Sequence, residues 1–146
     1  MRPSLRPTAP LAALLLAASG MAAAPASAEP APPPGPPLHH VRYTVTADAP
    51  FYADIYYRDR EPAVFADYSH NPYVFSPKAE ADIGPDQPWV LETQLADPDL
   101  WAMVVVQSGD SPNIPTPGFH CELAVDGVVV KTDSGPKGAL CSIRNW

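Results

Sequence analysis

Positive charge is scarce in this chain. It has 146 residues, with 9 lysines and arginines against 16 aspartates and glutamates, and a formal net charge of −7. Nucleic acids and anionic membrane surfaces select proteins with basic patches. The acidic balance therefore argues against either of them as the main partner, and we expect no binding to nucleic acid.

The sequence also lacks the motifs of common catalytic and cofactor sites. It contains neither a Gly-x-Ser-x-Gly elbow for a serine nucleophile nor a glycine-rich phosphate loop. Asp97, Asp99 and Asp110 stand in ordinary turn sequences, and the adjacent His39 and His40 have no fixed partners that would complete a metal site. We expect no enzyme activity, no cofactor and no metal ion.

Long apolar runs are missing too. The N-terminal run over residues 11–18 ends at a Ser-Gly pair, whereas a membrane-spanning helix needs about 20 apolar residues. Two arginines precede this run, and Ala-Ser-Ala follows it at 26–28. These are the three parts of a secretory signal peptide. We expect residues 1–28 to be cleaved after Ala28, and the protein to be secreted or to stay in the cell envelope. An uncleaved anchor is the alternative.

A proline-rich segment comes next, over residues 29–38. Six of the eight residues from 30 to 37 are proline, which favours an extended spacer without regular hydrogen bonding. It is a solvated linker, a stalk, or a ligand for a module that reads proline. Removing residues 1–28 takes away two arginines and no acid, which leaves 7 basic against 16 acidic residues, or −9.

Residues 39–146 have few windows in which a helix would be stable, because eleven prolines lie between Pro50 and Pro136. Alternating apolar and polar residues instead predict short strands, and Asp126-Gly127 between valine-rich runs predicts a tight hairpin. The whole region is expected to be one all-β domain, an antiparallel β-sandwich. Its predicted strands cover 41–47, 51–57, 89–95, 101–107, both arms of the hairpin at 123–130, and 139–144.

The segment 58–88 does not fit this pattern. It holds five prolines and little alternation, so we expect a long irregular loop with one short strand near 64–66. It contributes Tyr68 and Tyr73 to a candidate binding surface.

The rest of that surface comes from the preceding strand. Tyr52, Asp54 and Tyr56 share one face there, opposite Phe51 and Ile55. If the latter two point inward, the tyrosines and the carboxylate are exposed, in a pattern that suits sugar or protein binding. The alternative is that this face packs beneath the 58–88 segment.

Cys121 and Cys141 are the two cysteines of the chain. An even count in an exported protein favours a disulfide. They lie in predicted strands on either side of the hairpin, so a bridge is geometrically possible. A redox pair is disfavoured because there is no Cys-x-x-Cys. His120 suggests a metal site, but neighbours in a strand point to opposite faces. We expect a structural disulfide.

Several stretches between residues 41 and 144 share the pattern of a known family: Val41-Arg42-Tyr43-Thr44-Val45-Thr46, Ile55-Tyr56-Tyr57, Pro88-Trp89, the valine-rich 103–106, and Cys121-Glu122-Leu123-Ala124-Val125-Asp126-Gly127-Val128-Val129 with Cys141 after it. In these stretches the chain resembles the small mycobacterial membrane protein family, the accessory proteins of resistance-nodulation-division exporters for lipids and siderophores. It differs from that family in its Ala-x-Ala site, its proline spacer and its longer 58–88 segment.

The resemblance implies an immunoglobulin-like β-sandwich with one disulfide, outside the membrane. It also implies a noncatalytic accessory role in the export of lipids or siderophores through an actinobacterial envelope. The partner would then be the envelope transporter or the exported small molecule. The alternative is a free secreted module that binds a glycan, a lipid or a host protein without any transporter.

Overall fold

The computed structural model describes residues 28–109, 113 and 116–145. The chain divides into two units, Met1–Pro33 and Pro34–Trp146. Apart from Ala28, the expected signal peptide lies outside the described residues. The proline-rich residues 29–38 form no helix or strand and are exposed. No helix in the described part of the chain is long and apolar enough to cross a membrane.

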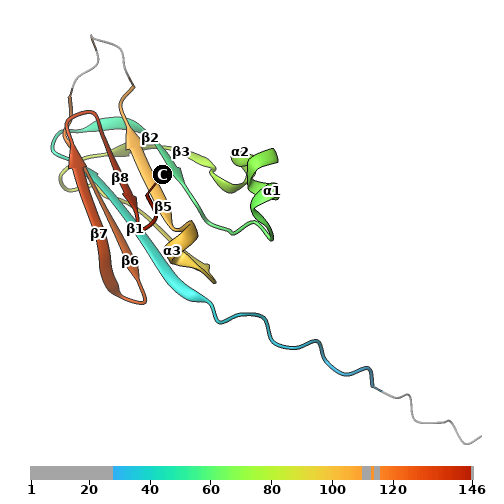
Figure 1. Ribbon diagram of the computed structural model, residues 1–146. Helices are drawn as coiled ribbons and strands as arrows, with labels where there is room; N and C mark the ends of the chain where they lie inside the picture. Colours follow the sequence, from blue (N-terminus) through green and yellow to red (C-terminus); the bar gives the residue numbers. More distant parts are fainter. Residues whose placement is uncertain (1–27, 110–112, 114–115, 146) are drawn as a thin grey trace, which may run out of the picture. The chain divides into compact units, whose positions relative to one another are not determined.

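The described residues of the second unit form eight strands arranged in two antiparallel four-stranded sheets (Figure 1). One sheet has the order β4-β1-β6-β7 and the other the order β3-β2-β5-β8. This confirms the predicted all-β sandwich. The strands are β1 (His39–Ala47), β2 (Phe51–Tyr57), β3 (Lys78–Ile83), β4 (Trp89–Leu95), β5 (Met103–Gln107), β6 (Phe119–Val125), β7 (Val128–Gly135) and β8 (Gly138–Ser142).

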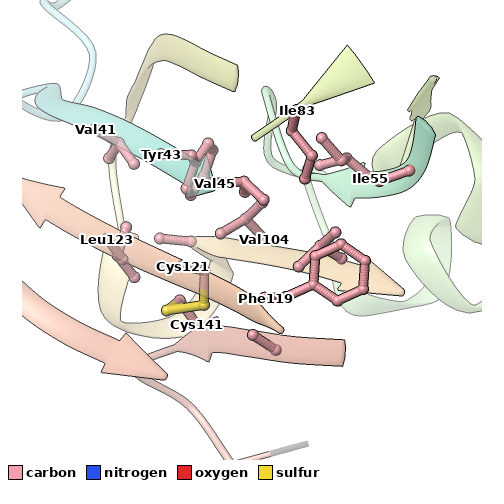
Figure 2. Close-up of a cluster of buried hydrophobic side chains, with 14 of the residues drawn as sticks. Val41, Tyr43, Val45, Ile55, Ile83, Val104, Phe119, Cys121, Leu123 and Cys141 are labelled. Carbon is pink, nitrogen blue, oxygen red and sulfur yellow. A yellow bond between two sulfur atoms is a disulfide. The ribbon is translucent and has the colours of Figure 1, made fainter. Parts of the chain in front are cut away.

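The core lies between the sheets and is built from alternate residues of the strands. In β1 the side chains of Val41, Tyr43 and Val45 are fully buried, and they face the buried Ile55 and Val104 of the other sheet (Figure 2). Because successive side chains of a strand point to opposite faces, the residues between them stay on the surface. In β5, Val104 and Val106 face the core and are fully buried, whereas Val105 between them is only partly buried, so this strand is not covered on both faces as its unbroken apolar run suggested.

The hairpin between β6 and β7 turns at Asp126 and Gly127, as predicted. Both residues have positive φ, 50° and 80° respectively. A type I′ turn needs this conformation at both central positions, and Asp and Gly tolerate it well. The local sequence is therefore enough to place this turn.

The predicted disulfide is confirmed. Cys121 in β6 is bonded to Cys141 in β8, so the bridge joins one sheet to the other through the core (Figure 2). Their Cα atoms are 6.0 Å apart.

The 58–88 segment differs from the prediction. A short helix, α1 (Phe65–His70), begins where a strand near 64–66 was expected, and a second short helix, α2 (Pro72–Phe75), and then β3 follow it. A further helix, α3 (Pro98–Trp101), occupies the start of the strand predicted at 101–107. Two of these helices begin with proline, which is compatible with the first helical turn and stops only longer helices. β3 was missed because its inward positions Ala79 and Ala81 are only weakly apolar.

Candidate functional site

The outer face of β2 carries the predicted triplet Tyr52, Asp54 and Tyr56. Ala53 and Ile55 between them are fully buried, so the triplet points away from the core. Tyr52 is 59% exposed, while Asp54 and Tyr56 are half-buried by neighbouring strands. With this exposure, Tyr52 does not pack beneath the 58–88 segment.

β3 lies beside β2 and adds a charged side chain to this face at every second position. Tyr52 is opposite Asp82, Asp54 is opposite Glu80, and Tyr56 is opposite Lys78. We call these six residues of the two strands the tyrosine–carboxylate face.

Lys78 is the centre of a hydrogen-bonded group on the tyrosine–carboxylate face. Its Nζ donates to Glu80 Oε1 at 2.6 Å and to Asp54 Oδ1 at 3.4 Å. The lysine bond lowers the pKa of Glu80 and, in return, raises the pKa of Lys78. Tyr52 donates its hydroxyl to Glu80 Oε2 at 3.3 Å, and the charge of Glu80 raises the pKa of Tyr52. Three carboxylates against one lysine leave this face acidic, with a neutral phenol at its edge.

The other two predicted surface tyrosines lie in α1 and α2. Tyr68 is half-buried: its ring packs edge-on against Trp101 at 5.7 Å, and its hydroxyl accepts a bond from Arg58 Nη2 at 3.0 Å. It packs α1 against the core. Tyr73, in contrast, is 87% exposed.

Arg58 is a buried residue that the sequence did not point out. Its guanidinium lies 4.6 Å from the centre of the Tyr68 ring and 5.4 Å from that of Trp101. Cation–π contacts of this kind strengthen when they are desolvated. Burial lowers the pKa of Arg58. The residues around Arg58 in the sequence do not indicate that its side chain is buried.

A hollow of about 550 Å³ lies over the outer face of the other sheet. Its side chains come from β1, β6 and β7 and are almost all hydrogen-bonding groups. His120 borders it, with Nε2 2.8 Å from Asp48 Oδ1. In the described part of the chain, no group of three or more His, Cys, Asp or Glu side chains is placed to hold a metal ion. The lining includes Thr44, Thr46, His120, Glu122, Thr132 and Ser134.

The two histidines that follow the spacer each lie close to the carboxylate of another segment. His39 Nδ1 is 2.7 Å from Asp126 Oδ2 in the β6–β7 turn, and His40 Nε2 is 3.6 Å from Glu92 in β4. The backbone N–H of His40 also donates to Asp126 Oδ1 at 2.9 Å. The turn is thereby tied to the residue where the domain begins.

This tie predicts a pH dependence of stability. The hydrogen bond to Asp126 raises the pKa of His39 above 6.5, and the bond from His39 lowers the pKa of Asp126 below 3.8. The stabilisation that His39 contributes is complete below pH 6.5 and is lost as the pH rises through the raised pKa of His39. The stabilisation that Asp126 contributes is lost as the pH falls through the lowered pKa of Asp126. We expect urea unfolding midpoints to be higher at about pH 5.5 than at about pH 8.5, and His39→Gln to reduce the difference. An equal difference in His39→Gln contradicts the prediction.

Comparison with known proteins places this fold among mycobacterial relatives. A family model described as the Rv2576c beta-sandwich domain matches residues 43–141. Uncharacterized protein Rv2576c of Mycobacterium tuberculosis strain H37Rv and uncharacterized protein Mb2606c of Mycobacterium bovis are each 36% identical over 108 residues. The match covers 74% of this chain and 68% of each relative.

Proposed function

The chain belongs to the Rv2576c β-sandwich domain family, and we propose that it is a noncatalytic binding protein of the actinobacterial cell envelope. We propose further that it acts as an accessory to an exporter of lipids or siderophores. The mycobacterial relatives support the type of envelope. The resemblance of the strands and of the cysteine hairpin to transport accessory proteins supports the role.

The tyrosine–carboxylate face is the observation that carries this proposal. Its side chains stand on β2 and β3, two paired strands of a sandwich whose sheets are joined by a disulfide. A surface fixed in this way loses little conformational entropy when a partner binds. Exposed tyrosines are frequent hot spots of protein interfaces, because each offers a rigid apolar ring with a polar tip.

The charge of the face indicates the chemistry of the partner. Asp54, Glu80 and Asp82 outnumber Lys78, and the chain after residue 28 has a net charge of −9 by the count above. Complementary charge speeds association and sets the relative orientation of the partners. The partner surface should therefore be basic, with an apolar position for Tyr52.

The double variant Tyr52→Ala, Tyr56→Ala tests the proposal. We expect it to lose most of the crosslinking to a resistance-nodulation-division transport protein in the native envelope. We expect its thermal midpoint to stay within about 5 °C of the unchanged protein, since neither ring belongs to the core. The measurements are crosslinking yield by mass spectrometry and thermal unfolding.

Val90→Ala is the matched control, because Val90 is an exposed apolar residue of β4 in the other sheet. It should crosslink like the unchanged protein. Equal crosslinking of the double variant and the control contradicts a role for this face. If the unchanged protein crosslinks to no transporter but retains a glycan or lipid, the free secreted module is the correct function instead.

A further inference from the structure

The open side of the sandwich, between β7 and β8, has two hollows that meet at Asp133 and Leu140. β7 and β8 lie next to each other there although they belong to different sheets (Figure 1). The hollows measure about 390 Å³ and about 280 Å³. Taken together they have the size of a small-molecule site. We call them the β7–β8 groove.

The groove gathers basic side chains in a protein that has few. Lys137 lines the larger hollow, and Lys131 and Arg144 line the smaller one. In the described part of the chain neither lysine lies within ion-pair distance of a carboxylate, whereas Arg42, Arg60 and Lys78 all do.

Asp133 is the one acid that lines both hollows, and it is already engaged. Its Oδ2 accepts the backbone N–H of Leu140 at 2.9 Å, which satisfies a donor on the free edge of β8. Lys131 and Lys137 together outnumber this one carboxylate, which leaves the groove positive. An anion entering here would meet Lys131 and Lys137 at little cost in broken ion pairs.

An apolar strip leads away from the lysines across the outer face of the second sheet. Leu140 in β8 is opposite Val105 in β5, and Val105 is opposite Tyr56 in β2. The three side chains lie on one face, and Leu140 is 38% exposed. Apolar area that a ligand covers here is removed from water, which favours binding.

We propose that the β7–β8 groove binds a free, single-chain anionic amphiphile. Its head group lies between Lys131 and Lys137, and its apolar body lies over Leu140 and Val105 toward Tyr56. The proposal rests on the binding role proposed above and names the chemical class of a ligand. Lysines at sheet edges also deter pairing with other chains, and that protective role predicts no difference between anionic and neutral ligands.

The probe for the test is dansylaminoundecanoic acid, a fluorescent carboxylate, used below its micelle concentration on the chain as purified from its host. We expect saturable binding, and at least about tenfold weaker binding in Lys131→Gln, Lys137→Gln, because charge-assisted bonds to the head group are lost. Leu140→Ser should weaken binding roughly fivefold through lost apolar contact. The methyl ester of the probe, which has no charge, should bind about as weakly to the unchanged protein as the carboxylate does to the lysine variant.

Arg42→Gln, Arg60→Gln is the matched control, because it removes the same charge from exposed residues outside the groove. It should bind the probe like the unchanged protein. The proposal is overturned if the lysine variant binds as tightly as this control, if the ester binds as tightly as the acid, or if the protein binds only anionic phospholipid vesicles. The lysine variant should still crosslink to the transporter. Probe binding without any transporter crosslinking contradicts the proposed function alone, and crosslinking without probe binding contradicts this inference alone.

Discussion

Replacing both Cys121 and Cys141 by alanine is expected to lower the free energy of unfolding by about 3 kcal/mol. This is the largest change in stability that we predict. The bridge spans 20 residues, and closing a loop of this length restricts the unfolded chain by about that amount. In a domain of this size the thermal midpoint should fall by roughly 10–20 °C.

The structural position of the bridge adds to this expectation. β8 is an edge strand of five residues whose in-sheet partner is β5, and Cys141 ties it to β6 of the opposite sheet. Without the bridge, β8 should open before the rest of the domain. Hydrogen exchange should therefore show the greatest loss of protection at the β8 amides, and least at β1, which has strands on both sides.

Thermal unfolding with and without a phosphine reductant provides the control for this prediction. The reductant should destabilise the unchanged protein and leave the double alanine variant unaffected. A variant whose midpoint equals that of the oxidised protein would show that the bridge contributes nothing to stability.

Tyr43→Phe is expected to destabilise the domain by about 2–3 kcal/mol although it removes a single oxygen atom. The Tyr43 hydroxyl donates to the backbone carbonyl of Arg58 at 2.7 Å and accepts from the backbone N–H of Met103 at 3.2 Å. Both bonds are buried. Removing the hydroxyl takes a partner from two buried backbone groups, and each such loss costs at least about 1 kcal/mol.

This hydroxyl also links the two sheets. Tyr43 lies in β1, whereas Met103 begins β5 and Arg58 follows β2 in the other sheet. Burial raises the pKa of Tyr43 far above its ordinary value, so the hydroxyl stays protonated while the protein is folded. Ultraviolet titration at high pH should then find Tyr43 ionising only with unfolding.

Tyr52→Phe is the matched control, since Tyr52 is exposed and its hydroxyl bonds to a surface glutamate, Glu80. Urea unfolding should show no measurable change for it. A loss below about 0.5 kcal/mol in Tyr43→Phe would mean that water replaces the phenol oxygen as a partner for these backbone groups.

The strands were predictable where apolar and polar residues alternate strongly. Val41, Tyr43 and Val45 fall on one face of β1 whatever their neighbours are, because a strand has a period of two. The hairpin at Asp126 and Gly127 was predictable because few residue pairs tolerate positive φ at both positions. β3 and the helices of the 58–88 segment escaped prediction, because alanines in a strand and prolines at helix starts are ambiguous without the surrounding sheet.

The candidate binding surfaces were likewise predictable only in part. The outward direction of Tyr52 follows from the burial of Ile55 and was predictable from β2 alone, whereas its exposure depended on where the 58–88 segment lies. The structural role of Tyr68 was not, because it depends on Arg58 and Trp101, which reach it from a different part of the chain. The β7–β8 groove was missed entirely, since Lys131 to Lys137 looks like a solvated turn in the sequence.

What the sequence by itself determined is local: the inward and outward faces of the strands, the tight turn, and the identity of the one possible disulfide pair. What only the tertiary structure decided is which distant segments meet. His39 reaches Asp126 from 87 residues away, and Leu140 lies beside Val105, which in turn lies beside Tyr56. The physical reason is that alternation specifies the two faces of a strand, whereas the order of strands in a sheet depends on how all of them share one core.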